Sequence, residues 1–268
     1  MKIKLIVLLM LFFSFSIQAQ VVNIEKKRKD KKEGIQGKIE LSLNITENTK
    51  KIIEGNNVIN LQYSKRAHTI LLLNDYSLMK VKTLGIEDED LINKNFQHFR
   101  YNYVLKDSSF ATFELFSQRQ QNKLKYLSFR GLFGAGFRFR IIENEILSIY
   151  FAPLLMYEHE ILSDSLLTKT KNLKEDLYTA ITLKIADNVY FSNVTYYQPA
   201  LYDLGNSDNF EPFLDFRISS ETELSFSIIK NKLEFNIKYQ MSYDSRPPIE
   251  LIHKPLFYTL KNQLIFNF

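Results

Sequence analysis

The sequence predicts an all-β chain, folded as a single antiparallel transmembrane β-barrel of about twelve strands with short periplasmic turns and longer extracellular loops. Three observations predict it. Apolar and polar residues alternate along most of the chain. Short and long polar connections also alternate between these segments. The mean hydropathy is −0.19, which is too low for helical membrane spans but typical of strands that expose one apolar face.

Residues 1–19 are predicted to be a secretory signal peptide. Lys2 and Lys4 precede an apolar stretch, and Ala19 ends a plausible cleavage site. An uncleaved membrane anchor is the alternative, although the apolar stretch is short for it. Residues 20–36 are assigned to a basic periplasmic linker that contains the run EKKRKDKKE. We interpret this run as a solvated segment, or alternatively as an arm that touches anionic lipid headgroups or the cell wall.

Residues 37–268 are assigned to the barrel, because period-two alternation begins near Gly37. Near the other end, Leu233, Phe235 and Ile237 alternate with polar residues in the same way. Successive side chains of a strand point to opposite faces, so each segment has one apolar and one polar face. The expected strands are 37–46, 57–64, 68–80, 95–105, 110–119, 125–142, 146–162, 176–187, 189–199, 211–229, 233–245 and 256–268.

The connections support an outer-membrane topology. Those near 65–66, 107–108, 143–145, 187–188 and 230–232 are expected to be tight turns. Longer loops are expected near 47–56, 81–94, 119–125, 163–175, 200–210 and 246–255. Outer-membrane barrels have short periplasmic turns and long extracellular loops, and an even number of strands places both termini in the periplasm.

Composition excludes several other classes of protein. The chain has 35 Lys and Arg against 30 Asp and Glu, a balance too even for nucleic-acid binding. It has no Cys, so a disulfide, a thiolate metal site and a lipoprotein anchor are impossible. A soluble barrel would also alternate, but with its apolar residues inside. Aromatic residues near strand ends favour the membrane because they form interfacial girdles; the candidates are Tyr101, Tyr103, Tyr157, Tyr196, Tyr239 and Tyr243.

The last strand places aromatic and aliphatic residues on one face and ends in an aromatic residue. These residues are Tyr258, Leu260, Leu264, Phe266 and Phe268. The pattern resembles the C-terminal signal that the outer-membrane barrel insertion machinery reads, and this machinery is therefore an expected partner during assembly. The signal peptide and this strand together predict localisation in the outer membrane, with its lipids as a second partner.

Two motifs resemble a known family. One runs from Arg130 as R-G-L-F-G-A-G-F-R, and the other is Y-D-S-R-P-P from Tyr243. Together they are similar to the salt-induced outer-membrane protein family, domain-of-unknown-function family 481, over roughly residues 95–268. The resemblance implies an outer-membrane barrel. It implies no established substrate and supplies no catalytic residues.

The polar face of the strands is predicted to line the lumen. The lining candidates are Arg100, Glu114, Arg130, Arg138, Arg140, Glu158, Arg217, Glu234 and Lys238, with His98, Lys184 and Asp215 also facing inward. These charges could form an ion-pair network that packs a narrow lumen, which the nearly balanced signs favour. Alternatively, the three arginines of residues 130–140 could form a ladder that selects anions. Gly134 and Gly136 are interpreted as structural, admitting a bulky neighbour or strand curvature.

The function expected from these features is a narrow channel or small-solute porin whose substrate, a small solute or ion, is unknown. The alternative is a non-conducting structural or envelope-stress barrel whose loops or basic arm bind partners. A lipase using His159 with Ser163 or Ser165 is a remote third possibility, and we expect no enzyme. No cofactor and no metal site are expected, since the four histidines lack ligand spacing. The sequence leaves the oligomeric state open.

Overall fold

The computed structural model describes residues 33–47, 50–83, 89–105, 110–205, 210–229, 233–248, 252 and 255–266. The expected signal peptide, most of the expected linker and the C-terminal Phe268 lie outside the described residues. No helix in the described ranges is both long and apolar enough to cross a bilayer.

The described residues form twelve strands, as the alternation predicts. The strands are β1 (Gly34–Glu47), β2 (Lys50–Lys65), β3 (His68–Thr83), β4 (Glu89–Val104), β5 (Ala111–Asn122), β6 (Leu127–Glu143), β7 (Leu147–Leu162), β8 (Lys169–Ala186), β9 (Val189–Asp203), β10 (Phe216–Ile229), β11 (Leu233–Asp244) and β12 (Leu256–Phe266). A single 3-10 turn, η1 (Lys123–Lys125), joins β5 to β6.

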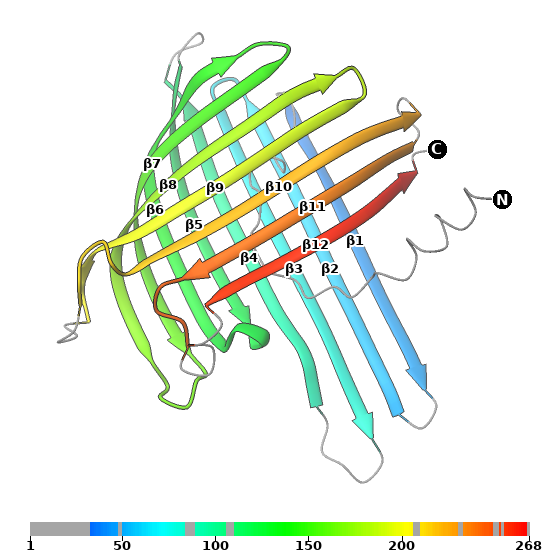
Figure 1. Ribbon diagram of the computed structural model, residues 1–268, viewed down its shortest axis with the longest axis vertical. Coiled ribbons are helices and arrows are strands. Elements are labelled where there is room, and N and C mark those ends of the chain that lie inside the picture. The colour runs from blue at the N-terminus through cyan, green and yellow to red at the C-terminus, as the bar shows by residue number, and fades with distance from the viewer. Residues whose placement is uncertain are drawn as a thin grey trace.

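Each strand pairs antiparallel with the next one along the chain, in the order β1 to β12. Figure 1 shows the resulting sheet curled into most of a barrel, with the first strands in the far wall and β9 to β12 in the near wall. We call the lower end in Figure 1, where β1 meets β2 and β11 meets β12, the loop end. The upper end, where β2 meets β3 and β8 meets β9, is the turn end.

The strands are longer than predicted at the loop end. β2 begins at Lys50 and β8 at Lys169, each seven residues earlier than expected, and β4 begins at Glu89. The predicted long loops at 47–56, 81–94 and 119–125 are therefore wrong, and the one predicted at 163–175 is shortened to 163–168. Polar residues there continue the hydrogen-bonded ladder, as Glu54 does opposite Asn44 and Met79. Long connections remain at 204–215 and 245–255, because β10 begins only at Phe216.

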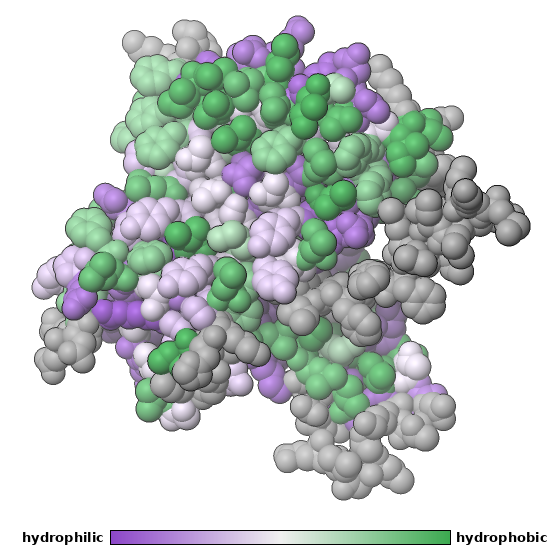
Figure 2. Space-filling view, viewed as in Figure 1, coloured by the Kyte–Doolittle hydropathy of each residue, from purple (hydrophilic) through white to green (hydrophobic). Residues whose placement is uncertain are grey.

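The two faces of the sheet have opposite polarity. On the outer face large apolar side chains are exposed, including Leu41 (71%), Phe133 (56%) and Leu155 (49%). Figure 2 shows such side chains spread over the outer surface of the near wall, most densely in its upper half. Among the described residues, the buried positions hold more polar and charged side chains than apolar ones. This is the reverse of a soluble protein, whose interior is mostly apolar.

One part of the inner face is apolar, which the alternation did not predict. A buried cluster on β5 to β9 contains Phe116, Leu132, Ala152, Leu154, Met156, Tyr178, Ala180, Val194 and Tyr196. The assignment of Tyr196 to an interfacial girdle is wrong, because its side chain is only 8% exposed and its ring lies 5.4 Å from that of Tyr178 inside the sheet. The parity of β9 turns Tyr197 outward instead, where its ring packs against Phe216.

Two glycines of the R-G-x-x-G-A-G-x-R motif, Gly134 and Gly136, lie where a side chain would collide with the neighbouring strands. A Cβ on Gly134 would lie 2.7 Å from the Phe116 ring and 2.9 Å from the Leu155 carbonyl. A Cβ on Gly136 would lie 2.4 Å from the Pro153 carbonyl and 2.7 Å from the Leu154 Cα. The β6–β7 ladder is also interrupted between Gly136 and Phe139. Of the two roles expected for these glycines, the contacts at Gly134 fit room for a bulky side chain, because the Phe116 ring lies where a Cβ would project.

We expect Gly136→Ala to destabilise the protein by more than the roughly 1–3 kcal/mol typical of overpacking, because the new Cβ meets backbone atoms that cannot rotate away. Gly55→Ala on β2 is the matched control, since no atom lies within 4 Å of its Cβ position. The urea midpoint of unfolding from detergent micelles measures both variants. An equal midpoint for the two would show that the β6–β7 approach is not tight.

Candidate functional site

The middle of the inner face holds a buried arginine surrounded by aromatic rings. Arg100 on β4 donates from Nη1 to Glu114 Oε2 on β5 at 2.7 Å, and Tyr178 Oη donates to the same oxygen at 3.1 Å. The guanidinium carbon lies 5.2 Å from the centroid of the Phe116 ring, and His98 stacks between Phe96 and Phe116. These contacts fix the arginine in one orientation, since each partner comes from a rigid strand.

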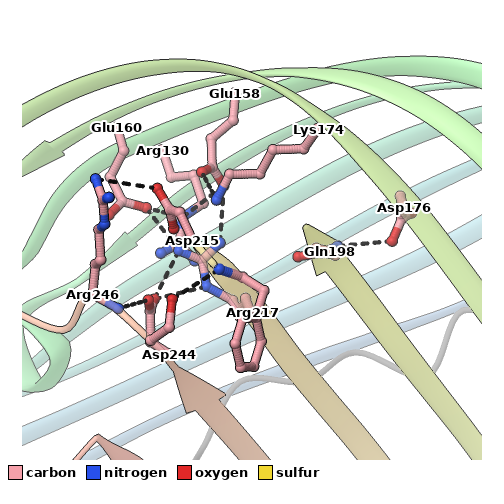
Figure 3. Close-up of polar contacts among 12 residues, drawn as sticks. Arg130, Glu158, Glu160, Lys174, Asp176, Gln198, Asp215, Arg217, Asp244 and Arg246 are labelled. Carbon is pink, nitrogen blue, oxygen red and sulfur yellow. Dashed lines mark hydrogen bonds and ion pairs between the residues drawn. The ribbon is translucent and has the colours of Figure 1, made fainter. Parts of the chain in front are cut away.

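A second group of charges lies near the loop end and joins β6, β7, β8, β10 and β11 (Figure 3). Glu158 on β7 is at its centre. It accepts from Lys174 Nζ at 2.8 Å and from Arg217 Nη1 at 2.9 Å. Arg217 on β10 also binds Asp244 on β11, at 2.9 Å. Buried charges are costly unless paired, so this network has the arrangement expected of an interior that neutralises itself.

The three arginines expected to form an anion-selective ladder occupy different environments. Arg130 lies on the inner face and pairs with Glu160 and, at 3.7 Å, with Glu158. Arg138 lies over the Tyr150 ring, 3.5 Å from its centroid. Arg140 is exposed near the turn end, where it pairs with Glu143. Each guanidinium thus has a local partner, which favours the ion-pair interpretation over a ring of like charge.

The remaining candidates are placed as follows. Lys238 on β11 contacts Glu221 at 2.9 Å, and Glu234 is half-buried on the same side of β11. Of the predicted insertion signal, Tyr258, Leu260 and Leu264 are exposed on the outer face of β12. The side chain of Phe266, and all of Phe268, lie outside the described residues.

A cavity of about 780 Å³, including space open to solvent, lies on the inner face between these two charged groups. Its wall includes Arg100 at one side and Lys125, Arg130 and Arg217 at the loop end. Asp176 on β8 also faces it and accepts from Gln198 Nε2 at 2.8 Å. The cavity is therefore continuous with both charged groups and is the best candidate for a place where a solute could reside.

Sequence reasoning missed several of these charges. Lys174 lies before the expected start of β8, and Asp176 lies at it. The start was predicted too late because Lys171 and Glu175, which face outward, are polar and hide the alternation. The period continues through Asn172, Lys174, Asp176 and Tyr178, all buried, so a search for polar residues at every second position would have found them. Glu160, Asp244 and Lys125 were missed because they lie at strand ends or in a turn.

The three histidines among the described residues lie apart from one another, on β3, β4 and β7. His159 is half-buried on the outer face, and its ring meets Phe129 edge-on at 5.8 Å. His68 stacks on Tyr101 near the turn end. Across the described residues, no three His, Asp or Glu side chains are grouped so that they could hold a metal ion.

Lys125, in η1, closes part of the loop end. Its Nζ lies 5.1 Å from the centroid of the Phe257 ring on β12, so the β5–β6 turn contacts the last strand across the opening. The side chain is half-buried. Burial of the ammonium group, with Arg130 and Arg217 nearby, lowers the pKa of Lys125 to about 7.

We expect the ammonium of Lys125 to lose its proton as the pH rises through about 7, well below the ordinary lysine value of 10.5. Because the unfolded chain holds that proton more tightly, the free energy of unfolding should rise between pH 7 and 10.5. Reductive ¹³C-methylation and NMR would measure the titration, with Lys125→Met identifying the resonance. A midpoint above 9 would contradict this description of the loop end.

Three comparisons with known proteins place the chain. The profile of the family described as "Protein of unknown function, DUF481" matches residues 60–254. No curated protein sequence matches significantly. Among solved structures, the chain is similar to the NanC porin in a rhombohedral crystal form, with 9% identity and a TM-score of 0.45. That alignment covers 85% of this chain and 100% of the porin chain.

Proposed function

Because the chain belongs to the DUF481 family, whose description leaves its function open, we propose a function from its own geometry: an integral outer-membrane β-barrel that provides a narrow passage for small polar solutes. The observation that carries this proposal is the inverted polarity of the sheet. Exposed apolar side chains cover its outer face, and charged and amide side chains are buried on its inner face.

The inverted polarity fits a lipid environment on energetic grounds. Leaving side chains such as Leu41, Phe133 and Leu155 exposed to water forgoes about 25 cal/mol for each Å² of apolar surface that lipid would cover. Near the loop end the centroid of the Phe216 ring lies 5.8 Å from that of Tyr197 and 5.7 Å from that of Tyr243. Aromatic side chains grouped in this way fit an interfacial girdle. Strands that pair with a neighbour on each side satisfy their backbone N–H and C=O groups, as the hydrocarbon core of a membrane requires.

The inner face supports a passage that is narrow. A cavity of about 780 Å³ with a polar wall opens from the loop end, but the apolar cluster on β5 to β9 lies beside it. Ion pairs such as Arg217–Asp244 and Lys174–Glu158 bring side chains from several strands together at the opening. These contacts limit the size of a permeating solute rather than define a wide aqueous pore.

The same contacts favour a second candidate, a non-conducting barrel with a structural role in the envelope. A lumen filled by Tyr178, Met156 and paired charges would block ions as well as solutes. The two candidates share the membrane-integral fold and differ only in whether the interior conducts.

We expect the refolded protein to give steady single-channel currents in planar bilayers, and Leu154→Ala to increase them. Leu154 is buried on the inner face, so its truncation widens the interior, at a cost of about 2–5 kcal/mol in stability. Leu155→Ala is the matched control, because the neighbouring side chain is 49% exposed on the outer face and should leave the conductance unchanged. A folded protein without current, in the wild type and in Leu154→Ala, would favour the structural barrel.

The proposal also predicts that β1 and β12 pair in the membrane. Among the described strands these two end the sheet, and no ladder joins them. An open strand edge in hydrocarbon leaves backbone groups unsatisfied, each at a cost of several kcal/mol. The register between β1 and β2 places the side chain of Ser42 on the inner face. On β12 Thr259 is buried on the inner face, so Lys261, two residues later, faces inward as well.

Cysteine pairs test this closure in a chain that has no native cysteine. We expect Ser42→Cys to form a disulfide in the membrane with Cys at one of the inward positions 259, 261 or 263. The control is Ser42→Cys with Leu260→Cys, whose side chains face opposite sides. Cross-linking through position 260, or through none of the four, would contradict a closed barrel with this parity.

A further inference from the structure

The cavity on the inner face has a wall whose charge differs from that of its surroundings. Arg100, Lys125, Arg130 and Arg217 all line it. Of the described residues, Asp176 alone contributes a carboxylate to the wall. The ion-pair network as a whole is nearly balanced, so the imbalance belongs to the cavity itself.

The carboxylates that pair with two of these arginines lie behind the cavity wall. Glu114, which holds Arg100 at 2.7 Å, does not line the cavity, and neither does Glu158, which holds Arg217 at 2.9 Å. These carboxylates orient the guanidinium groups without filling the space in front of them. In the wall itself, among the described residues, three guanidinium groups and Lys125 face the single carboxylate of Asp176, and an excess of one sign of charge in a cleft with low-dielectric walls favours ligands of the opposite sign.

The rest of the wall suits a polar organic molecule rather than a simple ion. Gln118, Gln120 and Gln198 contribute amides, and Ser219 contributes a hydroxyl. Such groups both donate and accept hydrogen bonds, and so match hydroxyls on a solute. The rings of Phe116 and Tyr196 supply an apolar surface.

We propose that this cavity binds a small hydroxylated organic carboxylate, with the arginines of its wall receiving the carboxylate and its amides the hydroxyls. Arginine is suited to this task because its planar group can donate two parallel hydrogen bonds to a carboxylate. The inference rests on the proposed function, since it places the permeating solute in the interior of the barrel and names its class.

The test uses three probes that share one six-carbon polyhydroxyl chain: gluconate, which is an anion, sorbitol, which is neutral, and protonated glucamine, which is a cation. Saturation-transfer NMR on the refolded protein in deuterated micelles measures binding without requiring conduction. We expect binding of gluconate, much weaker binding of sorbitol and no binding of glucamine. Equal binding of all three, or binding of none, would overturn the proposal.

Paired substitutions locate the site. The double variant Arg100→Gln with Glu114→Gln removes one wall cation together with its buried partner, which avoids leaving a lone charge. It should weaken gluconate binding about tenfold or more. Lys184→Gln with Asp187→Asn is the control, because it removes an ion pair at the β8–β9 turn, outside the cavity wall. Heat-dependent migration on gels shows that each variant is folded.

The outcomes separate this proposal from the proposed function. Gluconate binding that survives the Arg100 and Glu114 double substitution unchanged would overturn the site. Currents without gluconate binding would overturn the ligand class and leave the passage intact. Binding without currents would support the cavity as a ligand site and count against conduction.

Discussion

The ladder of hydrogen bonds between consecutive strands is the constraint on which the rest of the structure depends. Because each strand pairs with the next one along the chain, side chains divide strictly between two faces. The outer face can then be largely apolar, and the inner face can collect charge. The same ladder fixes the face on which Glu114, Glu158 and Arg217 lie. The Arg100–Glu114 pair joins adjacent strands, whereas the Arg217–Glu158 pair joins β10 to β7, which share no ladder.

The fold could be predicted from the sequence because period two is a local signal. All twelve strands are present, and the largest errors are at the loop end, where polar residues such as Lys169, Lys171 and Lys174 continue the pairing. A smaller error is at the turn end, where β1 begins at Gly34 inside the predicted linker. The site could be predicted only in part. Parity places Arg100, Glu114, Glu158 and Arg217 on the inner face, but which strands face one another across the interior is a long-range property. Tyr196 and Met156 show a second limit, since an apolar side chain at an inward position looks the same in a sequence as one that faces lipid.

The interior combines two ways of filling space that are normally separate. The apolar cluster on β5 to β9 packs like the core of a soluble domain, whereas the groups around Glu158 and Glu114 are held by charge. Tyr178 belongs to both, because its ring lies in the cluster and its hydroxyl donates to Glu114. Arg100 is therefore fixed from two sides, by packing and by its pair with Glu114. A side chain held in this way would lose little conformational entropy on binding the proposed ligand.

The strictly sequential order of the strands has a consequence for how the chain reaches its native state. Contacts between neighbours in sequence have low contact order, so hairpins can add to one another rapidly and from either end. Joining β1 to β12 is the one step that spans the whole sheet. If the proposed joining follows the ordering of the intervening strands, its cost is that of bending a formed sheet rather than of closing a free chain.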